Sequence, residues 1–130
     1  MKRIVLIFSV VSAGMLFFAC GGKGNEMKNT YIRITASEAK QIMDEKSGYI
    51  ILDVRRQDEY ETGHIPGAAL LPNEEIGKGA IEMLPDKDQI ILVYCRSGNR
   101  SRQAAQKLAE LGYTNVYEFG GIIDWPYEIE

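Results

Sequence analysis

The chain has 130 residues, enough for one domain, and its 45% hydrophobic and 25% charged residues are ordinary values for a globular protein. The net charge of −3 and the lack of a basic stripe argue against a nucleic-acid partner. The two cysteines, Cys20 and Cys95, lie in very different contexts, which excludes a disulfide framework as the basis of the fold.

The first twenty residues have the pattern of a bacterial lipoprotein signal. A basic start is followed by residues 4–18, which are almost wholly apolar. This run is short for a transmembrane helix but suits the hydrophobic region of a signal peptide. It ends in Ala19-Cys20, and a small residue directly before a cysteine resembles the lipoprotein cleavage site. In that family the cysteine sulfur receives a diacylglyceryl group, so we predict lipidation of Cys20.

Cleavage there would divide the chain into a signal peptide (1–19), a flexible tether (20–30) and a folded domain (31–130). The tether is predicted because residues 21–30 are polar and contain glycine. Acyl chains on Cys20 would bury many CH₂ groups and hold the domain at a membrane. We therefore expect a lipid-anchored protein of the bacterial cell envelope that faces the periplasm. The alternatives are an ordinary secretory peptide and an uncleaved anchor.

Strands and helices alternate from residue 31 onward, which predicts an α/β sandwich with a mostly parallel central sheet flanked by helices. The helix that begins at Ala36 has a capping box in Thr35 and Glu38 and ends at Ser47-Gly48. Short apolar runs predict strands, and helical spacing or turn chemistry predicts the helices between them. The expected strands are 31–34, 49–54, 69–71, 90–94 and 116–119, and the expected further helices are 56–62, 73–84, 102–111 and a turn at 122–125.

Cys95 follows the strand 90–94 and opens a glycine-containing loop that leads into a helix. The first N–H groups of a helix have no partner within the helix, and a loop with a glycine can direct further N–H groups at one point. Such a nest stabilises a thiolate, which is the reactive form of cysteine, and Arg96, Arg100 and Arg102 add positive charge nearby. Ligand sites of parallel sheets lie at the carboxyl ends of strands, where Asp53 is also expected. We therefore interpret Cys95 as a nucleophile rather than as a buried structural cysteine.

Five motifs follow one another along the predicted domain. They are Leu52-Asp53-Val54-Arg55, Glu59-Tyr60, Gly63-His64-Ile65-Pro66-Gly67-Ala68, the segment from Val93 to Ser101, and Gly120-Gly121 with Trp125. In this order and spacing they resemble the rhodanese family of sulfurtransferases in its single-domain form. The resemblance implies a rhodanese domain over 31–130 and a persulfide cycle. In that cycle Cys95 takes a sulfane sulfur from thiosulfate or a similar donor and passes it to a thiol or cyanide acceptor. It implies neither a cofactor nor a metal, and Glu74-Glu75 with a single histidine give no metal-ligand cluster.

The resemblance also implies roles for the residues around Cys95. Arg96 directly follows the nucleophile and can bind the sulfonate of thiosulfate, whereas relatives that prefer mercaptopyruvate usually have a small residue there. Arg100 corresponds to an arginine that braces the loop, often against an acidic group, and bracing and substrate contact both stay open. The remaining predicted residues of the active loop, which bind through backbone N–H groups, are Ser97, Gly98, Asn99 and Ser101.

Three polar residues outside the loop have less direct roles. Asp53 and Arg55 are expected to support the site structurally, by pairing with the backbone or with each other, rather than to act in acid–base catalysis. His64, the single histidine, lies in a Pro-Gly turn segment. A thiolate already stabilised by its nest needs no general base, so His64 is not expected to be catalytic.

Two other functions compete with sulfur transfer. Some cysteine phosphatases and arsenate reductases resemble this fold, but their loops place one more residue between cysteine and arginine than the four found here. The shorter loop favours a sulfur atom over a tetrahedral phosphate. The second alternative is a non-catalytic sulfur carrier or binding module that delivers sulfur to a protein acceptor.

Overall fold

The computed structural model describes residues 29–77 and 79–130. The predicted signal peptide, Cys20 and most of the tether lie outside these residues. The elements are β1 (Ile32–Arg33), α1 (Ala36–Glu45), β2 (Ile50–Asp53), α2 (Gln57–Thr62), β3 (Ala69–Leu70), the 3₁₀ turn η1 (Asn73–Glu75), β4 (Ile90–Cys95), α3 (Asn99–Glu110), β5 (Asn115–Gly121) and the 3₁₀ turn η2 (Ile122–Asp124). Within the described part of the chain, no helix has the length and apolar character needed to cross a membrane.

The five strands form one parallel sheet in the order β1-β5-β4-β2-β3. The central strand β4 places Val93 beside Leu52 of β2 and Glu118 of β5. This arrangement confirms the predicted α/β fold with its mostly parallel sheet. Because the strands are parallel, the carboxyl ends of β2, β4 and β5 lie at one edge, where this class of sheet binds ligands.

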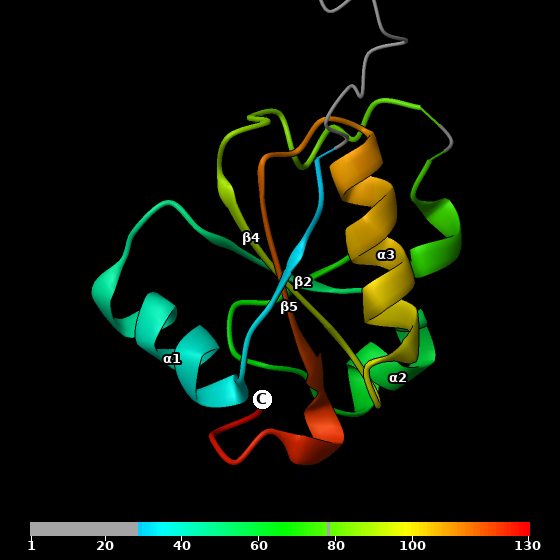
Figure 1. The fold of residues 1–130 in the computed structure, drawn as a ribbon. Helices are drawn as coiled ribbons and strands as arrows, with labels where there is room; N and C mark the ends of the chain where they lie inside the picture. Colours follow the sequence, from blue (N-terminus) through cyan, green and yellow to red (C-terminus); the bar gives the residue numbers. More distant parts are fainter. Residues whose placement is uncertain (1–28, 78) are drawn as a thin grey trace, which may run out of the picture.

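Helices cover both faces of the sheet, with α1 on one side and α3 on the other (Figure 1). Each face has its own buried cluster. Val93 and Cys95 belong to the cluster on the α3 side, while Leu92 and Tyr94 belong to the one on the α1 side. The alternation follows from the period of two along a strand, and burial on both faces explains why β4 is apolar throughout. Tyr94 and Cys95 therefore point to opposite faces.

The predicted capping box of α1 is confirmed. The Glu38 N–H donates to Thr35 Oγ1 at 3.1 Å, and the Thr35 N–H donates to Glu38 Oε1 at 3.1 Å. Two N–H groups at the start of the helix, which have no partner inside it, are satisfied in this way.

The helix predicted over 73–84 is wrong, because only the short turn η1 forms there. Gly77 and Gly79 have φ angles of 101° and 135°, values that no α-helix contains. The apolar residues of the segment, Ile76 and Leu84, are nevertheless 4% and 1% exposed. An irregular segment, rather than a helix, therefore brings these residues into the core.

The helix predicted over 102–111 begins three residues earlier, at Asn99. Gly98 precedes it with a φ of 104°, a left-handed conformation that residues with a side chain rarely adopt. Gly98 turns the chain out of the loop at this point, so Arg100 and Ser101 belong to the first turn of α3. The unpaired N–H groups of that turn consequently lie beside the loop.

Gly121 allows the active loop to pack directly against the end of β5. A Cβ atom at position 121 would lie 2.6 Å from Ser97 Cα and would overlap the Arg96 carbonyl oxygen. Both obstacles are backbone atoms, which cannot rotate away as a side chain can. Position 121 must therefore lack a side chain for the loop to keep its path.

We expect Gly121→Ala to lower the free energy of unfolding by about 2–3 kcal/mol, since it forces backbone apart in a packed region. The same substitution should slow alkylation of Cys95, because the loop has to move. Denaturant unfolding and the alkylation rate measure the two effects. Gly67→Ala is the control, since position 67 has open space and only its φ of 80° opposes a side chain. A Gly121→Ala protein with wild-type stability would contradict the requirement.

Candidate active site

Cys95 is the last residue of β4, and its side chain lies beneath the loop that leads into α3. The residue is 1% exposed. The Gly98 N–H donates to Cys95 Sγ at 3.0 Å. Hydrogen bonding from the N–H groups of Ser97 and Ser101 and from the Ser101 hydroxyl also lowers the pKa of this thiol. The sulfur atom is thus surrounded by donors from the loop and from the first turn of the helix.

These donors stabilise the thiolate form of Cys95 although the residue is buried. Burial raises the pKa of the Cys95 thiol, but the hydrogen bonds from Ser101, Gly98 and Ser97 together outweigh it, so that the pKa lies below its ordinary value. A lowered pKa increases the share of the thiolate, which is the nucleophilic form of cysteine. The site can therefore attack an electrophilic sulfur without a general base.

Arg100 forms a two-bond ion pair with Glu59 of α2. Its Nη1 and Nη2 atoms donate to Glu59 Oε2 and Oε1 at 2.7 Å and 2.8 Å. The Arg100 guanidinium lowers the pKa of Glu59 to about 2, although burial opposes this shift. Of the two roles left open for Arg100, the geometry favours bracing, since both terminal nitrogens already serve Glu59.

The other polar residues of the loop lie on its outer side. Arg96, Ser97 and Asn99 are exposed, whereas Gly98 is buried. The Arg96 carbonyl accepts the Ile123 N–H at 3.3 Å, which ties the loop to η2. No described residue forms an ion pair with the Arg96 guanidinium, so this group is open to an anion arriving from solvent.

Asp53 and Arg55 form a buried ion pair at the end of β2. Arg55 Nη2 donates to Asp53 Oδ2 at 2.7 Å and to the Gly63 carbonyl, also at 2.7 Å. The Tyr94 hydroxyl donates to Asp53 Oδ2 at 2.7 Å and accepts the Ile65 N–H at 3.0 Å. Burial, together with the Asp53 carboxylate, raises the pKa of Tyr94 and keeps its hydroxyl a donor.

This network lies on the α1 side of the sheet, because Tyr94 belongs to the cluster of that face and Cys95 to the other. Asp53 and Arg55 therefore hold the turn around Gly63 and the end of β4 in place without approaching the sulfur. The geometry is that of structural support.

Glu118 is a polar residue near the site that the sequence analysis missed. It is 1% exposed on β5, and its Oε1 accepts the Ser101 hydroxyl at 2.7 Å and the Gly120 N–H at 2.8 Å. Its Oε2 lies 3.4 Å from Nε of Arg33, which is 64% exposed. The alternation of side chains along a strand could have indicated that Glu118 is buried, since it lies on the same face as Val116, an apolar core residue.

His64 is held by its own neighbours, away from Cys95. Its ring stacks on Tyr60 with the centroids 3.8 Å apart, and Nδ1 lies 3.0 Å from the Tyr60 carbonyl. Nε2 lies 3.3 Å from Glu130 Oε1. Both ring nitrogens therefore have partners in the α2 and C-terminal region.

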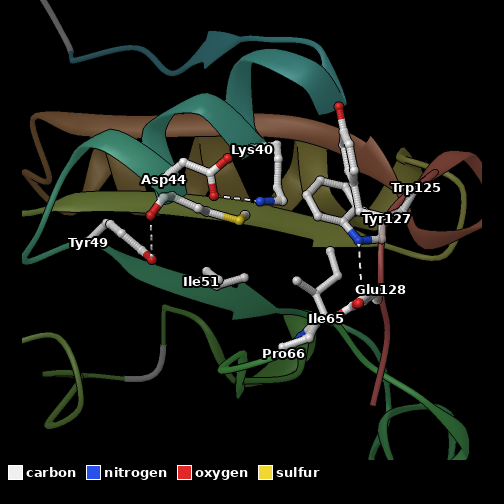
Figure 2. A pocket seen from close by; sticks show the side chains of 10 residues that line it. Lys40, Asp44, Tyr49, Ile51, Ile65, Pro66, Trp125, Tyr127 and Glu128 are labelled. Carbon is white, nitrogen blue, oxygen red and sulfur yellow. Dashed lines mark hydrogen bonds and ion pairs between the residues drawn. The ribbon is translucent and has the colours of Figure 1, made fainter.

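A cavity of about 520 Å³ lies between α1, β2 and the C-terminal segment (Figure 2). Its wall includes Ile51, Ile65 and Trp125, which belong to the buried cluster on the α1 side, and none of its lining residues is part of the loop 95–101. The cavity and the sulfur are therefore on opposite faces of the sheet, and we assign the chemistry to the loop.

Residues 35–126 match the family model of the rhodanese-like domain. The chain belongs to this family. It is 38% identical over 73 residues to the thiosulfate sulfurtransferase PspE of Escherichia coli, and the aligned segment covers 56% of this chain and 70% of PspE. It is 35% identical over 116 residues to the putative sulfur carrier protein YrkF of Bacillus subtilis, with 88% of this chain and 62% of YrkF covered.

The fold agrees with solved rhodanese structures. A structure described as a rhodanese with anions from E. coli superposes with a TM-score of 0.59 at 34% identity, covering 63% of this chain and 96% of that one. The rhodanese-like fold and a family that includes sulfurtransferases are thus shown by sequence and by structure.

Two parts of the predicted site need separate mention. Within residues 29–77 and 79–130, no group of three or more His, Cys, Asp and Glu side chains is placed to hold a metal ion. Cys95 is the free cysteine of this part of the chain, and the predicted lipidation site at Cys20 lies outside it.

We expect Glu59→Gln to lower the free energy of unfolding by about 2 kcal/mol near pH 7, because a charge-assisted double hydrogen bond is lost. The pKa of Glu59 is depressed in the folded state, so its contribution is complete above the unfolded value of about 4.3 and is lost as the pH falls toward 2. Denaturant unfolding of both proteins at several pH values measures the difference.

The matched control is Glu61→Gln on the same helix, where the exposed carboxylate accepts a hydrogen bond only from Gln57. This change should alter stability by no more than a few tenths of a kcal/mol. A Glu59→Gln effect that stays constant from pH 7 to pH 2.5 would show that the ion pair is not its source.

Proposed function

We propose that the protein is a sulfurtransferase that moves a sulfane sulfur from thiosulfate or a similar anionic donor to a thiol or cyanide acceptor. The observation that supports this most directly is the Gly98 N–H 3.0 Å from Cys95 Sγ, with further donors from Ser97 and Ser101 around a sulfur whose pKa is lowered. Such a nest stabilises a thiolate and, equally, the anionic outer sulfur of a persulfide.

The first step is attack of the Cys95 thiolate on the outer sulfur of the donor. The bond between this sulfur and the rest of the donor breaks, sulfite leaves with the electron pair, and Cys95 becomes a persulfide. In the second step the acceptor attacks the outer sulfur and the Cys95 thiolate leaves. The two steps return the enzyme to its starting state without any change in its oxidation level.

Arg96 supports an anionic donor. Arg96 directly follows the nucleophile and is exposed, and a guanidinium can bind two oxygen atoms of a sulfonate at once. The name of the relative PspE as a thiosulfate sulfurtransferase points the same way. A carrier function remains the second candidate, supported by the relative YrkF, whose name is that of a putative sulfur carrier protein.

Treatment with thiosulfate should add the mass of one sulfur atom to the protein, and peptide mapping should locate it on Cys95. Subsequent cyanide should remove it as thiocyanate in repeated turnovers, whereas a carrier would release it only to a protein acceptor. Cys95→Ser should gain no sulfur, since an alcohol with a high pKa does not ionise in this nest. Mercaptopyruvate should be the poorer donor.

The proposal fails if Cys95 gains no sulfur from any sulfane donor. Turnover of an aryl phosphate that disappears in Cys95→Ser would favour the phosphatase alternative instead.

We further propose that the protein is anchored to a membrane of the bacterial cell envelope by acyl chains on Cys20, with the domain facing the periplasm. The supporting observation is the sequence alone, in which Ala19-Cys20 follows a basic start and an apolar run. The domain itself is acidic, so the lipid would provide the membrane affinity.

Intact-mass analysis of the protein from a bacterial envelope should show a chain that begins at Cys20 and carries acyl chains. Cys20→Ala should block both cleavage before residue 20 and recovery with the membrane fraction, whereas Cys95→Ser should alter neither. An unmodified Cys20, or an N-terminus at another residue, would rule out the anchor.

A further inference from the structure

Glu118 is a buried carboxylate beside the active loop, and the proposed reaction does not use it. Its Oε1 lies 3.8 Å from the place where a Cβ of Gly98 would be, and therefore directly behind the loop. The residue is 1% exposed, and a buried carboxylate is retained in a core only with specific partners. Those partners are the Ser101 hydroxyl, the Gly120 N–H and the outward-reaching Arg33.

The Ser101 hydroxyl can donate one hydrogen bond but has several acceptors within reach. Its oxygen lies 2.7 Å from Glu118 Oε1, 3.0 Å from the Gly98 carbonyl and 3.4 Å from the Gly120 carbonyl. A hydrogen bond from the same hydroxyl is also one of the causes that lower the pKa of the Cys95 thiol. A hydroxyl carries one proton, so donation to Glu118 and donation to Cys95 exclude each other. Glu118 has the shortest of these distances and, as a carboxylate, is the strongest acceptor.

We propose that Glu118 is a positioning residue of the sulfur-transfer site, which competes with Cys95 Sγ for the single hydroxyl proton of Ser101. This inference rests on the proposed function. When Cys95 is a thiol or a persulfide, Sγ carries no charge and the proton points to Glu118. When Cys95 is a thiolate, the hydroxyl rotates toward Sγ. No bond other than a hydrogen bond is made or broken in this exchange.

The competition limits how strongly the loop stabilises the thiolate. A thiolate of very low pKa is abundant but weakly nucleophilic, and the best attacking thiol has a pKa near the ambient pH. Glu118 acts in the same direction as a like charge near Cys95, since both disfavour the anion. The loop donors and Glu118 therefore oppose each other, and their balance determines the reactivity of the sulfur.

Other charged groups surround this pair and must be considered in any titration. From β1, Arg33 faces Glu118, and from α3, Arg100 faces Cys95 but is paired with Glu59 of α2. Arg96 lies on the exposed side of the loop. The same three guanidinium groups are present in the wild type and in every variant below, so a difference between the pH profiles of Cys95 alkylation reports on the substituted residue.

The test is the pH dependence of iodoacetamide alkylation at Cys95 in the full chain, with peptide mapping to separate Cys95 from Cys20. Glu118→Gln keeps the shape and an acceptor oxygen but removes the charge, which weakens its hold on the Ser101 proton. We expect the midpoint to fall by about one pH unit. Ser101→Ala removes the shared donor, and we expect its midpoint to rise by a similar amount.

Glu110→Gln is the matched control, since it removes the same charge at the far end of α3, about 14 Å along the helix from Ser101. Its midpoint should equal that of the wild type. The two active-site variants should move in opposite directions, because one frees the proton for sulfur and the other deletes it. A purely structural role would loosen the loop in both and raise both midpoints.

Midpoints that rise in both variants, or an unchanged midpoint in either, overturn the inference. If Glu118→Gln does not fold, as judged by thermal unfolding, Ser101→Thr takes its place, because it keeps the hydroxyl donor. The inference then requires a raised midpoint in Ser101→Ala and a midpoint near that of the wild type in Ser101→Thr. An unchanged midpoint in Ser101→Ala, or a raised one in both variants, overturns it. Failure of the proposed function is a separate outcome, because it would appear as wild-type protein that gains no sulfur from thiosulfate, whatever the alkylation midpoints.

Discussion

The convergence of hydrogen-bond donors on Cys95 Sγ is the constraint on which the rest of the site depends. The chain must turn from the end of β4 into α3 within Arg96, Ser97 and Gly98, which requires a left-handed residue at Gly98. The turn is also so tight that the loop lies against the backbone of Gly121. Gly98 and Gly121 come from distant segments, yet both shape the loop around the same sulfur atom, because a side chain at either position would widen the nest.

Hydrogen bonds from the loop and the first turn of α3, rather than formal charges, account for the lowered pKa of Cys95. The sequence places the positive charges of Arg96, Arg100 and Arg102 near the thiolate, although a solvated helix face is favoured for Arg102. In the structure the charge of Arg100 is balanced by Glu59, and Arg102 is exposed on the helix surface. Exposed charges are screened by salt over about 8–10 Å, whereas N–H groups in direct contact with the sulfur are not. In the proposed reaction the N–H groups hold the anionic sulfur and Arg96 binds the anionic donor.

Features that depend on local pattern could be predicted, and features that depend on distant partners could not. The alternation of strands and helices, the capping box of Thr35 and the position of Cys95 at a strand end all follow from neighbouring residues. The partner of Arg100 lies 41 residues away in sequence, so its acidic character was expected but Glu59 was not identified. The error over 73–84 came from extending one helix across Gly77 and Gly79, whose φ angles are incompatible with a helix.

The position of the sulfur also determines how two substrates can reach it. Cys95 is buried beneath the loop, with Tyr94 and the Asp53–Arg55 pair closing the other face of the sheet. The outer side of the loop, where Arg96 is exposed, is the side of the site that faces solvent. Ile123, which is 59% exposed, donates its N–H to the Arg96 carbonyl on this side. In the proposed cycle the persulfide has to persist between the departure of sulfite and the arrival of the acceptor. The hydrogen-bond donors that stabilise the thiolate also stabilise the persulfide. The same geometry therefore supports both the attack and the covalent intermediate of the proposed cycle.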